Sequence, residues 1–261
     1  MTPSVIDTHV HLDDAAFVEG AAEVWRRARE AGVEAAVAVG VEPSSWARTV
    51  AIAAQLPGVR VALGIHPQCV PGLDDATLDA ALKELPDRLR AVSAVAVGEC
   101  GLDGPTGQMD RQERVLFAHI SIAKELSLPV SLHVFRVHGP ALRLLKHFGP
   151  MPAGGVLHSY SGSAELVRDY RKLGWSFGFA GAVTRSNAKR PLTAAIAVPL
   201  EHLLLETDAP FQPTGADARD RSRGEPRDVF DVLAALAHAR GLGVEVLAEA
   251  TTANARRLFR L

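Results

Sequence analysis

Two histidines, His9 and His11, are separated by a single residue at the end of a short apolar run. Alternate side chains of a β-strand lie on one face, so a strand here would point both imidazoles in the same direction. Neutral imidazole is a common protein ligand for transition metals, and two converging rings can hold two corners of a metal site. Single ligand-type residues recur at the ends of later apolar runs, at His66, Glu99, His133, His158 and Asp208. The pattern predicts a metal centre assembled from several strands.

The elements that would position these side chains alternate between β-like and helix-like segments. Most of the apolar runs lack a clean alternation, as is typical of strands covered on both faces. We predict eight strands, at residues 5–11, 35–40, 60–65, 92–99, 129–134, 155–159, 175–183 and 203–207. Helical patterns include residues 21–31, 44–55, 112–126, 140–148, 164–173, 228–240 and 244–258.

Strands that alternate with helices in this way favour one architecture. Right-handed βαβ units repeated eight times close on themselves, and the chain has the usual length of one such barrel, with 261 residues of which 48% are hydrophobic. We therefore predict an α/β fold, a (β/α)8 TIM barrel, in which residues 1–261 form a single domain. An open doubly wound sheet is the alternative, but its glycine-rich phosphate-binding turn is absent after the first predicted strand.

The barrel gives the scattered ligand-type residues a common location. Active sites of such barrels lie at the C-terminal ends of the strands, and every ligand-type residue falls at or just past a predicted strand end. A histidine taken alone is usually structural or on the surface. That interpretation is given to the histidines placed mostly on helices or their flanks, which are His119, His138, His147, His202 and His238. The joint placement of the others favours a metal centre.

The number of candidate ligands predicts the chemistry. Four imidazoles and two carboxylates are more than one tetrahedral ion needs, so we expect two divalent ions about 3.5–4 Å apart. Glu99 is the best bridging ligand, because a carboxylate can give one oxygen to each ion. His9, His11 and Asp208 would complete one site, and His133 and His158 the other. A shared water would become the nucleophile, with Asp208 as a possible acceptor of its proton. Mg, Mn and Zn all remain open.

Composition limits the partners. The formal net charge of −2 gives no overall positive field, so any contact with nucleic acid must be local and short. The two cysteines do not form a disulfide framework, which fits a reducing compartment. No signal peptide and no run of membrane-spanning length are present, so we expect a cytoplasmic protein without an evident obligate protein partner.

Longer motifs surround these residues. They are DTHVHL at 7–12, GIHP at 64–67, GECGLD at 98–103, LPVSLH at 128–133, HSYSGS at 158–163, ETDAP at 206–210, RGEP at 223–226 and TTANARRLF at 251–259. On these motifs the chain resembles the TatD family of metal-dependent deoxyribonucleases, within the amidohydrolase-like barrels. The resemblance covers essentially the whole chain, and the GECGLD and ETDAP elements are its most specific parts.

The resemblance implies a (β/α)8 hydrolase of phosphodiester bonds in DNA, often a 3′-to-5′ exonuclease on single strands that uses Mg or a related divalent ion. Short single-stranded DNA ends would be the substrate. The implied metal ligands are His9, His11, Glu99, His133, His158 and Asp208. The implied role of His66 is to face the substrate phosphate.

Some positions depart from the family pattern. Family members usually carry an arginine two residues after the equivalent of His133, whereas Arg136 here is displaced by one position. We still predict that Arg136 binds substrate. The polar segment 212–227 contains four arginines, and Arg221 and Arg223 are predicted to bind phosphate, although a solvated loop balanced by acidic neighbours is the alternative.

Two other classes of function remain open. The displaced arginine keeps a small-molecule substrate possible, such as an ester, lactone or amide hydrolysed on the same barrel. A non-catalytic binding protein is the other class. The complete set of ligand-type residues argues against it, because buried charged groups are costly to retain without a use.

Overall fold

Each strand of the central sheet pairs in parallel with the next strand along the chain, in the order β1 to β8. The structure, a computed structural model, describes residues 3–215 and 223–261. The strands are β1 (Val5–Val10), β2 (Val33–Gly40), β3 (Val59–Leu63), β4 (Ala96–Asp103), β5 (Val130–Phe135), β6 (Gly155–Leu157), β7 (Trp175–Phe179) and β8 (Leu203–Leu205).

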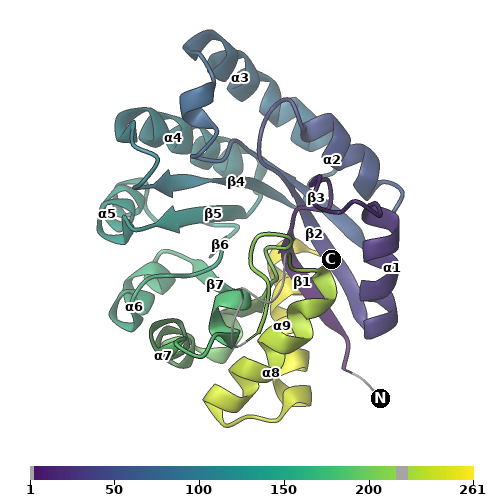
Figure 1. The fold of residues 1–261 in the computed structure, drawn as a ribbon. Coiled ribbons are helices and arrows are strands. Elements are labelled where there is room, and N and C mark those ends of the chain that lie inside the picture. The colour runs from purple at the N-terminus through teal and green to yellow at the C-terminus, as the bar shows by residue number, and fades with distance from the viewer. Residues whose placement is uncertain (1–2, 216–222) are drawn as a thin grey trace.

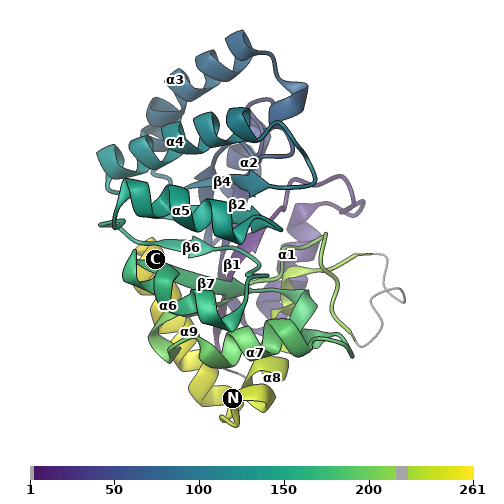
Figure 2. The same ribbon diagram turned by 90° about the vertical axis from the view of Figure 1, so that its left-hand side faces the viewer.

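Helices surround these strands on the outside (Figure 1). They are α1 (Ala21–Ala31), α2 (Trp46–Ala53), α3 (Asp75–Ala91), α4 (Met109–Leu126), α5 (His138–Phe148), α6 (Ala164–Lys172), α7 (Lys189–Ala197), α8 (Val229–Arg240) and α9 (Val244–Phe259). Figure 2 shows α4, α5, α6 and α7 side by side along one flank of the sheet. The predicted (β/α)8 TIM barrel is confirmed.

The barrel closes where the first strand meets the chain just after the last one. An isolated parallel bridge joins Val10 to Ala209. The backbone N–H of His11 donates to the carbonyl of Ala209 at 2.9 Å, and the N–H of Asp208 donates to the carbonyl of His9 at 3.0 Å. Closure therefore brings three of the predicted ligands together.

The interior of the barrel is filled by small and branched apolar side chains. Val37, Val39, Ala62 and Val156 belong to one buried cluster, which Phe259 of α9 joins. A larger apolar cluster packs the strands against the surrounding helices. Because both sides of the strands are buried, alternation is weak in the sequence, as predicted. Polar groups collect at the carboxyl ends of the strands, where the interior opens.

The bounds of six predicted strands differ from the structure by at most two residues at either end, and two strands differ by more. The fourth was predicted at 92–99 but is Ala96–Asp103, because α3 runs to Ala91 and Val92 caps it. The seventh was predicted at 175–183 but ends at Phe179, and a 3₁₀ turn at Gly181–Thr184 follows. The first correction moves Glu99 from the end of its strand to the middle.

The residues that the structure describes include no helix long and apolar enough to cross a membrane.

Candidate metal centre

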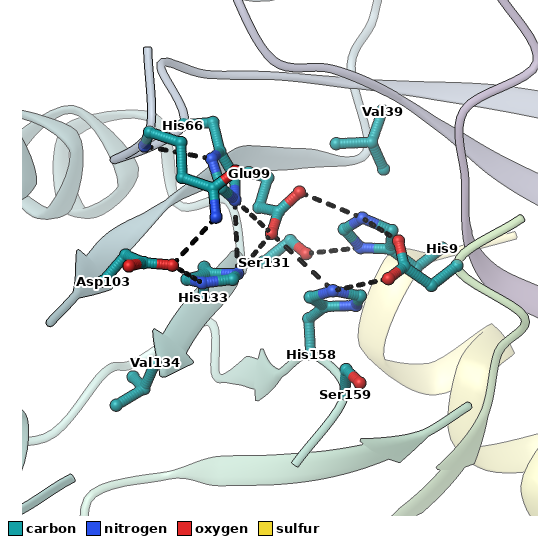
Figure 3. Close-up of polar contacts among 12 residues, drawn as sticks. His9, Val39, His66, Glu99, Asp103, Ser131, His133, Val134, His158 and Ser159 are labelled. Atoms are coloured by element: carbon teal, nitrogen blue, oxygen red, sulfur yellow. Dashed lines mark hydrogen bonds and ion pairs between the residues drawn. The ribbon is translucent and has the colours of Figure 1, made fainter. Parts of the chain in front are cut away.

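The carboxylate of Glu99 lies between two groups of imidazoles (Figure 3). Its Oε2 atom is 3.2 Å from Nε2 of His9. Its Oε1 atom is 2.9 Å from Nδ1 of His133 and 3.1 Å from Nε2 of His66. Only 2% of Glu99 is exposed. Each carboxylate oxygen therefore faces a separate set of donors.

The pairing of β4 with β5 is irregular next to Glu99. Val97 pairs with Val130 and Cys100 with Leu132, so β4 has one more residue than β5 over this interval. Such a bulge bends a strand and changes the direction of a side chain, and bulges are common beside active sites. A similar shift lies between Asp7 and Val10 in β1, next to His9.

The first group of donors consists of His9, His11 and Asp208. The Nε2 atoms of the two histidines are 3.3 Å apart, so the rings converge as the sequence predicts. Oδ1 of Asp208 lies 3.2 Å from Nε2 of His11 and 3.9 Å from Nε2 of His9. The other ring nitrogen of His11 contacts the carbonyl of Val39 at 3.3 Å, and that of His9 contacts the hydroxyl of Ser131 at 3.2 Å. A carbonyl can only accept, so the proton of His11 is on Nδ1 and its Nε2 lone pair is available.

The second group contains His133 and His158. Nε2 of His158 lies 3.7 Å from Glu99 Oε1 and 3.7 Å from Asp208 Oδ2. The ring of His158 stacks on that of His9 with centroids 3.6 Å apart. Nδ1 of His133 faces Oε1 of Glu99 at 2.9 Å. The group therefore adjoins both the bridging carboxylate and the first group.

His66 joins the cluster with a different hydrogen-bonding pattern. Its Nδ1 accepts the backbone N–H of Gln68 at 3.1 Å. In the neutral ring the proton is then on Nε2, which faces Glu99 Oε1 and lies 3.2 Å from Nδ1 of His133. Although His66, Glu99 and His133 are close enough to hold an ion, this pattern makes His66 a hydrogen-bond donor.

Two acidic residues that we did not predict as site residues contact the rings of His133 and His158 on the side away from Glu99. Oδ2 of Asp103 is 3.3 Å from Nε2 of His133. Oε1 of Glu206 is 3.0 Å from Nδ1 of His158 and accepts the backbone N–H of Ser159. Both acids are in the motifs singled out above, GECGLD and ETDAP, but residue types alone do not distinguish a supporting acid from a ligand.

Burial and charge act in opposite directions on the acidic groups. Burial raises the pKa of Glu99, but the imidazoles of His66 and His158 outweigh it and hold that pKa well below the ordinary value. The pKa of Asp208 is likewise lowered, despite burial, chiefly by His158. Burial lowers the pKa of His158, but Glu206 and Asp208 raise it to about 10. Both carboxylates are therefore ionised at neutral pH, and binding an ion through His158 would release a proton.

Two of the predicted arginines, Arg136 and Arg223, do not line this centre. Two cavities open beside it, of about 550 Å³ and 390 Å³, and neither Arg136 nor Arg223 is among the residues that line them. Arg136 is exposed, with its guanidinium 5.1 Å from the ring centroid of Phe135. Arg223 donates to the carbonyl of Ala16 and to Glu19. Arg221 lies outside the described residues.

A parallel eight-stranded barrel with two sets of imidazoles around one buried carboxylate defines a metal-dependent hydrolase. Residues 6–260 match the family model described as TatD related DNase. The chain belongs to this family.

Relatives match over nearly the whole chain. The uncharacterized metal-dependent hydrolase YabD of Bacillus subtilis is 34% identical over 260 residues, which cover 98% of this chain and 99% of YabD. The 3′-5′ ssDNA/RNA exonuclease TatD of Klebsiella pneumoniae is 34% identical over 261 residues, covering 98% and 97%. The crystal structure of the TatD homologue YjjV from Escherichia coli superposes with a TM-score of 0.91 at 32% identity and covers 100% of both chains.

Proposed function

We propose that this protein is a divalent-metal-dependent deoxyribonuclease that cleaves phosphodiester bonds of single-stranded DNA from the 3′ end. The observation that carries the proposal is the position of Glu99, whose two oxygens face two separate groups of donors at 2.9–3.2 Å. A carboxylate in that position suits a ligand that bridges two ions.

The donor set fits two divalent ions. We assign one ion to His9, His11 and Asp208, and the other to His133 and His158, with Glu99 shared between them. The contacts of the Nδ1 atoms support this assignment. The contact of His11 with the carbonyl of Val39 leaves its Nε2 lone pair directed into the centre, and the contacts of His9 and His158 orient their rings. When bound, Mg, Mn or Zn would lower the pKa of a coordinated water and stabilise negative charge on a phosphate.

The protein's own groups supply the remaining steps. Asp208 is ionised, and its Oδ2 atom accepts a hydrogen bond from Gln212 at 2.8 Å, so this oxygen is fixed in position. We assign Asp208 the role of accepting the proton of the attacking water. His66, whose Nε2 carries the proton, would donate to a phosphate oxygen. Asp103 and Glu206 keep the rings of His133 and His158 in orientation.

Two observations support DNA as the substrate. The name of the Klebsiella pneumoniae relative includes single-stranded DNA, RNA and the 3′-5′ direction. Phe211 is 61% exposed and its ring lies 5.2 Å from that of His11, so a base at the strand end would have an aromatic surface beside the centre. Substrate binding by Arg136, Arg221 and Arg223 stays a prediction. A cytoplasmic location is supported by the two cysteines, which are free.

The test uses single-stranded oligonucleotides labelled at the 3′ or the 5′ end. The protein is stripped with chelator and then supplied with Mg, Mn or Zn separately. Glu99→Ala should lose both metal and cleavage, whereas Glu249→Ala, which removes an exposed carboxylate from α9, should keep both.

The label released first gives the direction of cleavage. Full activity in Glu99→Ala would contradict the bridging role. Stoichiometric metal binding without cleavage under any ion would reject the nuclease and favour a small-molecule ester, lactone or amide as substrate.

A further inference from the structure

The larger cavity beside the metal centre is lined by two chemically different sets of residues. One set belongs to the metal centre and includes His133, His158 and Asp208. The loop after β7 and the start of α7 contribute Arg185 and Arg190 to the same cavity. Its volume of about 550 Å³ is in the range of small-ligand sites, roughly 300–1,000 Å³. A ligand in it would therefore contact the centre and the two cations together.

These two arginines form no direct ion pair among the described residues, although the charge of Arg190 contributes to the lowered pKa of Glu165. Both are exposed, and neither forms an ion pair or a side-chain hydrogen bond with any residue in the ranges 3–215 and 223–261. The acidic residues of the cavity, Asp103 and Asp208, are both committed to histidines of the metal centre. The guanidinium groups are thus available to an anionic ligand.

The position of Arg190 is unfavourable for the stability of helix α7. It is the second residue of α7, whose first turn contains Lys189 and Arg190 and no acidic residue. The N-terminal end of a helix has partial positive charge, so cations there are unfavourable unless an anion compensates them. A bound phosphate would supply that compensation.

The rest of the cavity lining is mostly apolar. It includes Val134, Phe179, Val183 and Pro191. Ser161 adds a hydroxyl, held 3.1 Å from Nε2 of His138. Such a lining suits a sugar and a base, with one polar contact to fix their orientation.

We propose that this cavity is a nucleotide subsite, in which Arg185 and Arg190 bind the phosphate one nucleotide away from the scissile bond. The inference rests on the proposed function, since it deepens the substrate assignment of the same centre. It also fits the absence of Arg136 from the cavity lining, because Arg185 and Arg190 would supply the phosphate contacts.

The test compares a thymidine dinucleotide with the same dinucleotide carrying a terminal phosphate at its 3′ or its 5′ end. All three have one scissile diester, so only the second phosphate differs. In the native protein one of the terminal phosphates should lower KM. The double variant Arg185→Gln/Arg190→Gln should remove that advantage, raising KM for this substrate about tenfold relative to the unphosphorylated one. The salt dependence of log KM should fall by about 0.7, as expected for one lost phosphate contact on a single strand.

The control is Arg168→Gln/Arg171→Gln, which removes two exposed arginines from α6 that do not line the cavity. It should keep the preference for the terminal phosphate. An equal loss in both double variants would indicate a general charge effect and overturn the subsite. No loss in Arg185→Gln/Arg190→Gln would overturn it as well.

Failure of the nuclease proposal is separable from failure of the subsite. If the native protein hydrolyses none of the three dinucleotides, the proposed function fails. Calorimetric binding of the phosphorylated dinucleotides then decides the subsite. Binding lost only in Arg185→Gln/Arg190→Gln supports it, and absent or equal binding in all three proteins overturns it.

Discussion

The carboxylate of Asp7 accepts two hydrogen bonds from Thr207, one from the backbone N–H at 2.9 Å and one from the hydroxyl at 2.6 Å. Asp7 is in β1 and Thr207 follows β8, so these bonds cross the line along which the barrel closes. The same carboxylate accepts the N–H of His9 at 3.2 Å. Because Thr207 precedes Asp208, this one buried acid fixes the spacing between ligands from the two ends of the chain.

We predict that Thr207→Val destabilises the barrel by about 2 kcal/mol without changing the side-chain shape, because it removes the hydrogen bond from the hydroxyl to the buried carboxyl of Asp7 and leaves the N–H of Ala209 without its acceptor. Urea unfolding would measure the change. Thr193→Val is the control, since Thr193 is exposed and its hydroxyl donates to the carbonyl of Lys189 in its own helix. If the two substitutions lowered the free energy of unfolding equally, the contact with Asp7 would not be what stabilises the closure of the barrel.

Much of the fold was predictable because strands and helices alternate with regular spacing. Two helices were not singled out, and each contains a proline. Pro86 lies inside α3, and Pro191 lies in the first turn of α7. Proline is unfavourable in helix interiors, yet α3 buries Leu78 and Leu85 against the barrel, and tertiary packing outweighs the local preference.

The sequence predicted which side chains lie close together better than it predicted how they are arranged. His9 and His11 converge as strand alternation requires. The position of Glu99 within its strand was not predictable, because the bulge beside it depends on the pairing of β4 with β5. Arg185 and Arg190 were also missed. They follow the seventh strand, which was predicted to end at residue 183, and become relevant only through the cavity that they line.

The support that Glu206 gives to His158 yields a second prediction. Glu206→Gln should weaken metal binding about 10- to 100-fold, the usual effect of losing a carboxylate that orients a histidine ligand. Gly178→Ala should act in the same direction, since a Cβ at Gly178 would overlap the Glu206 carboxylate. Gly72→Ala is the control, because a Cβ there meets nothing within 4 Å. Metal titration by calorimetry distinguishes the outcomes, and unchanged affinity in Glu206→Gln would contradict the orienting role.

Metal removal should lower the stability of the native protein. An ion that binds the folded chain only, at 100 times its dissociation constant, adds about 2.7 kcal/mol to the free energy of unfolding. Thermal melting with added Mn and with chelator should therefore give two distinct Tm values for the native chain. Glu99→Ala should give nearly the same Tm in both conditions, while Glu249→Ala should behave like the native chain. If added Mn raised the Tm of Glu99→Ala as much as that of the native chain, Glu99 would be excluded as a main ligand.

His119 should make the protein sensitive to mild acid. It is fully buried in α4, contacts the carbonyl of Val115 through Nδ1 at 2.8 Å and accepts the N–H of Ile65 through Nε2 at 3.0 Å. Burial lowers its pKa to about 4. In the unfolded chain a histidine takes up a proton below about pH 6.5. Its contribution to stability is therefore full above pH 6.5 and is lost as the pH falls toward 4.

Between pH 7 and pH 5 this loss should be about 2 kcal/mol, from the linkage between proton binding and folding. His119→Gln should be less stable at pH 7, since it disturbs the contacts with Val115 and Ile65, but its stability should change less between the two pH values. Urea unfolding in the presence of chelator measures both quantities without a contribution from bound metal. His238→Gln, at an exposed position of α8, should retain the pH dependence of the native chain. If His119→Gln shows that same dependence, the acid sensitivity arises from other groups.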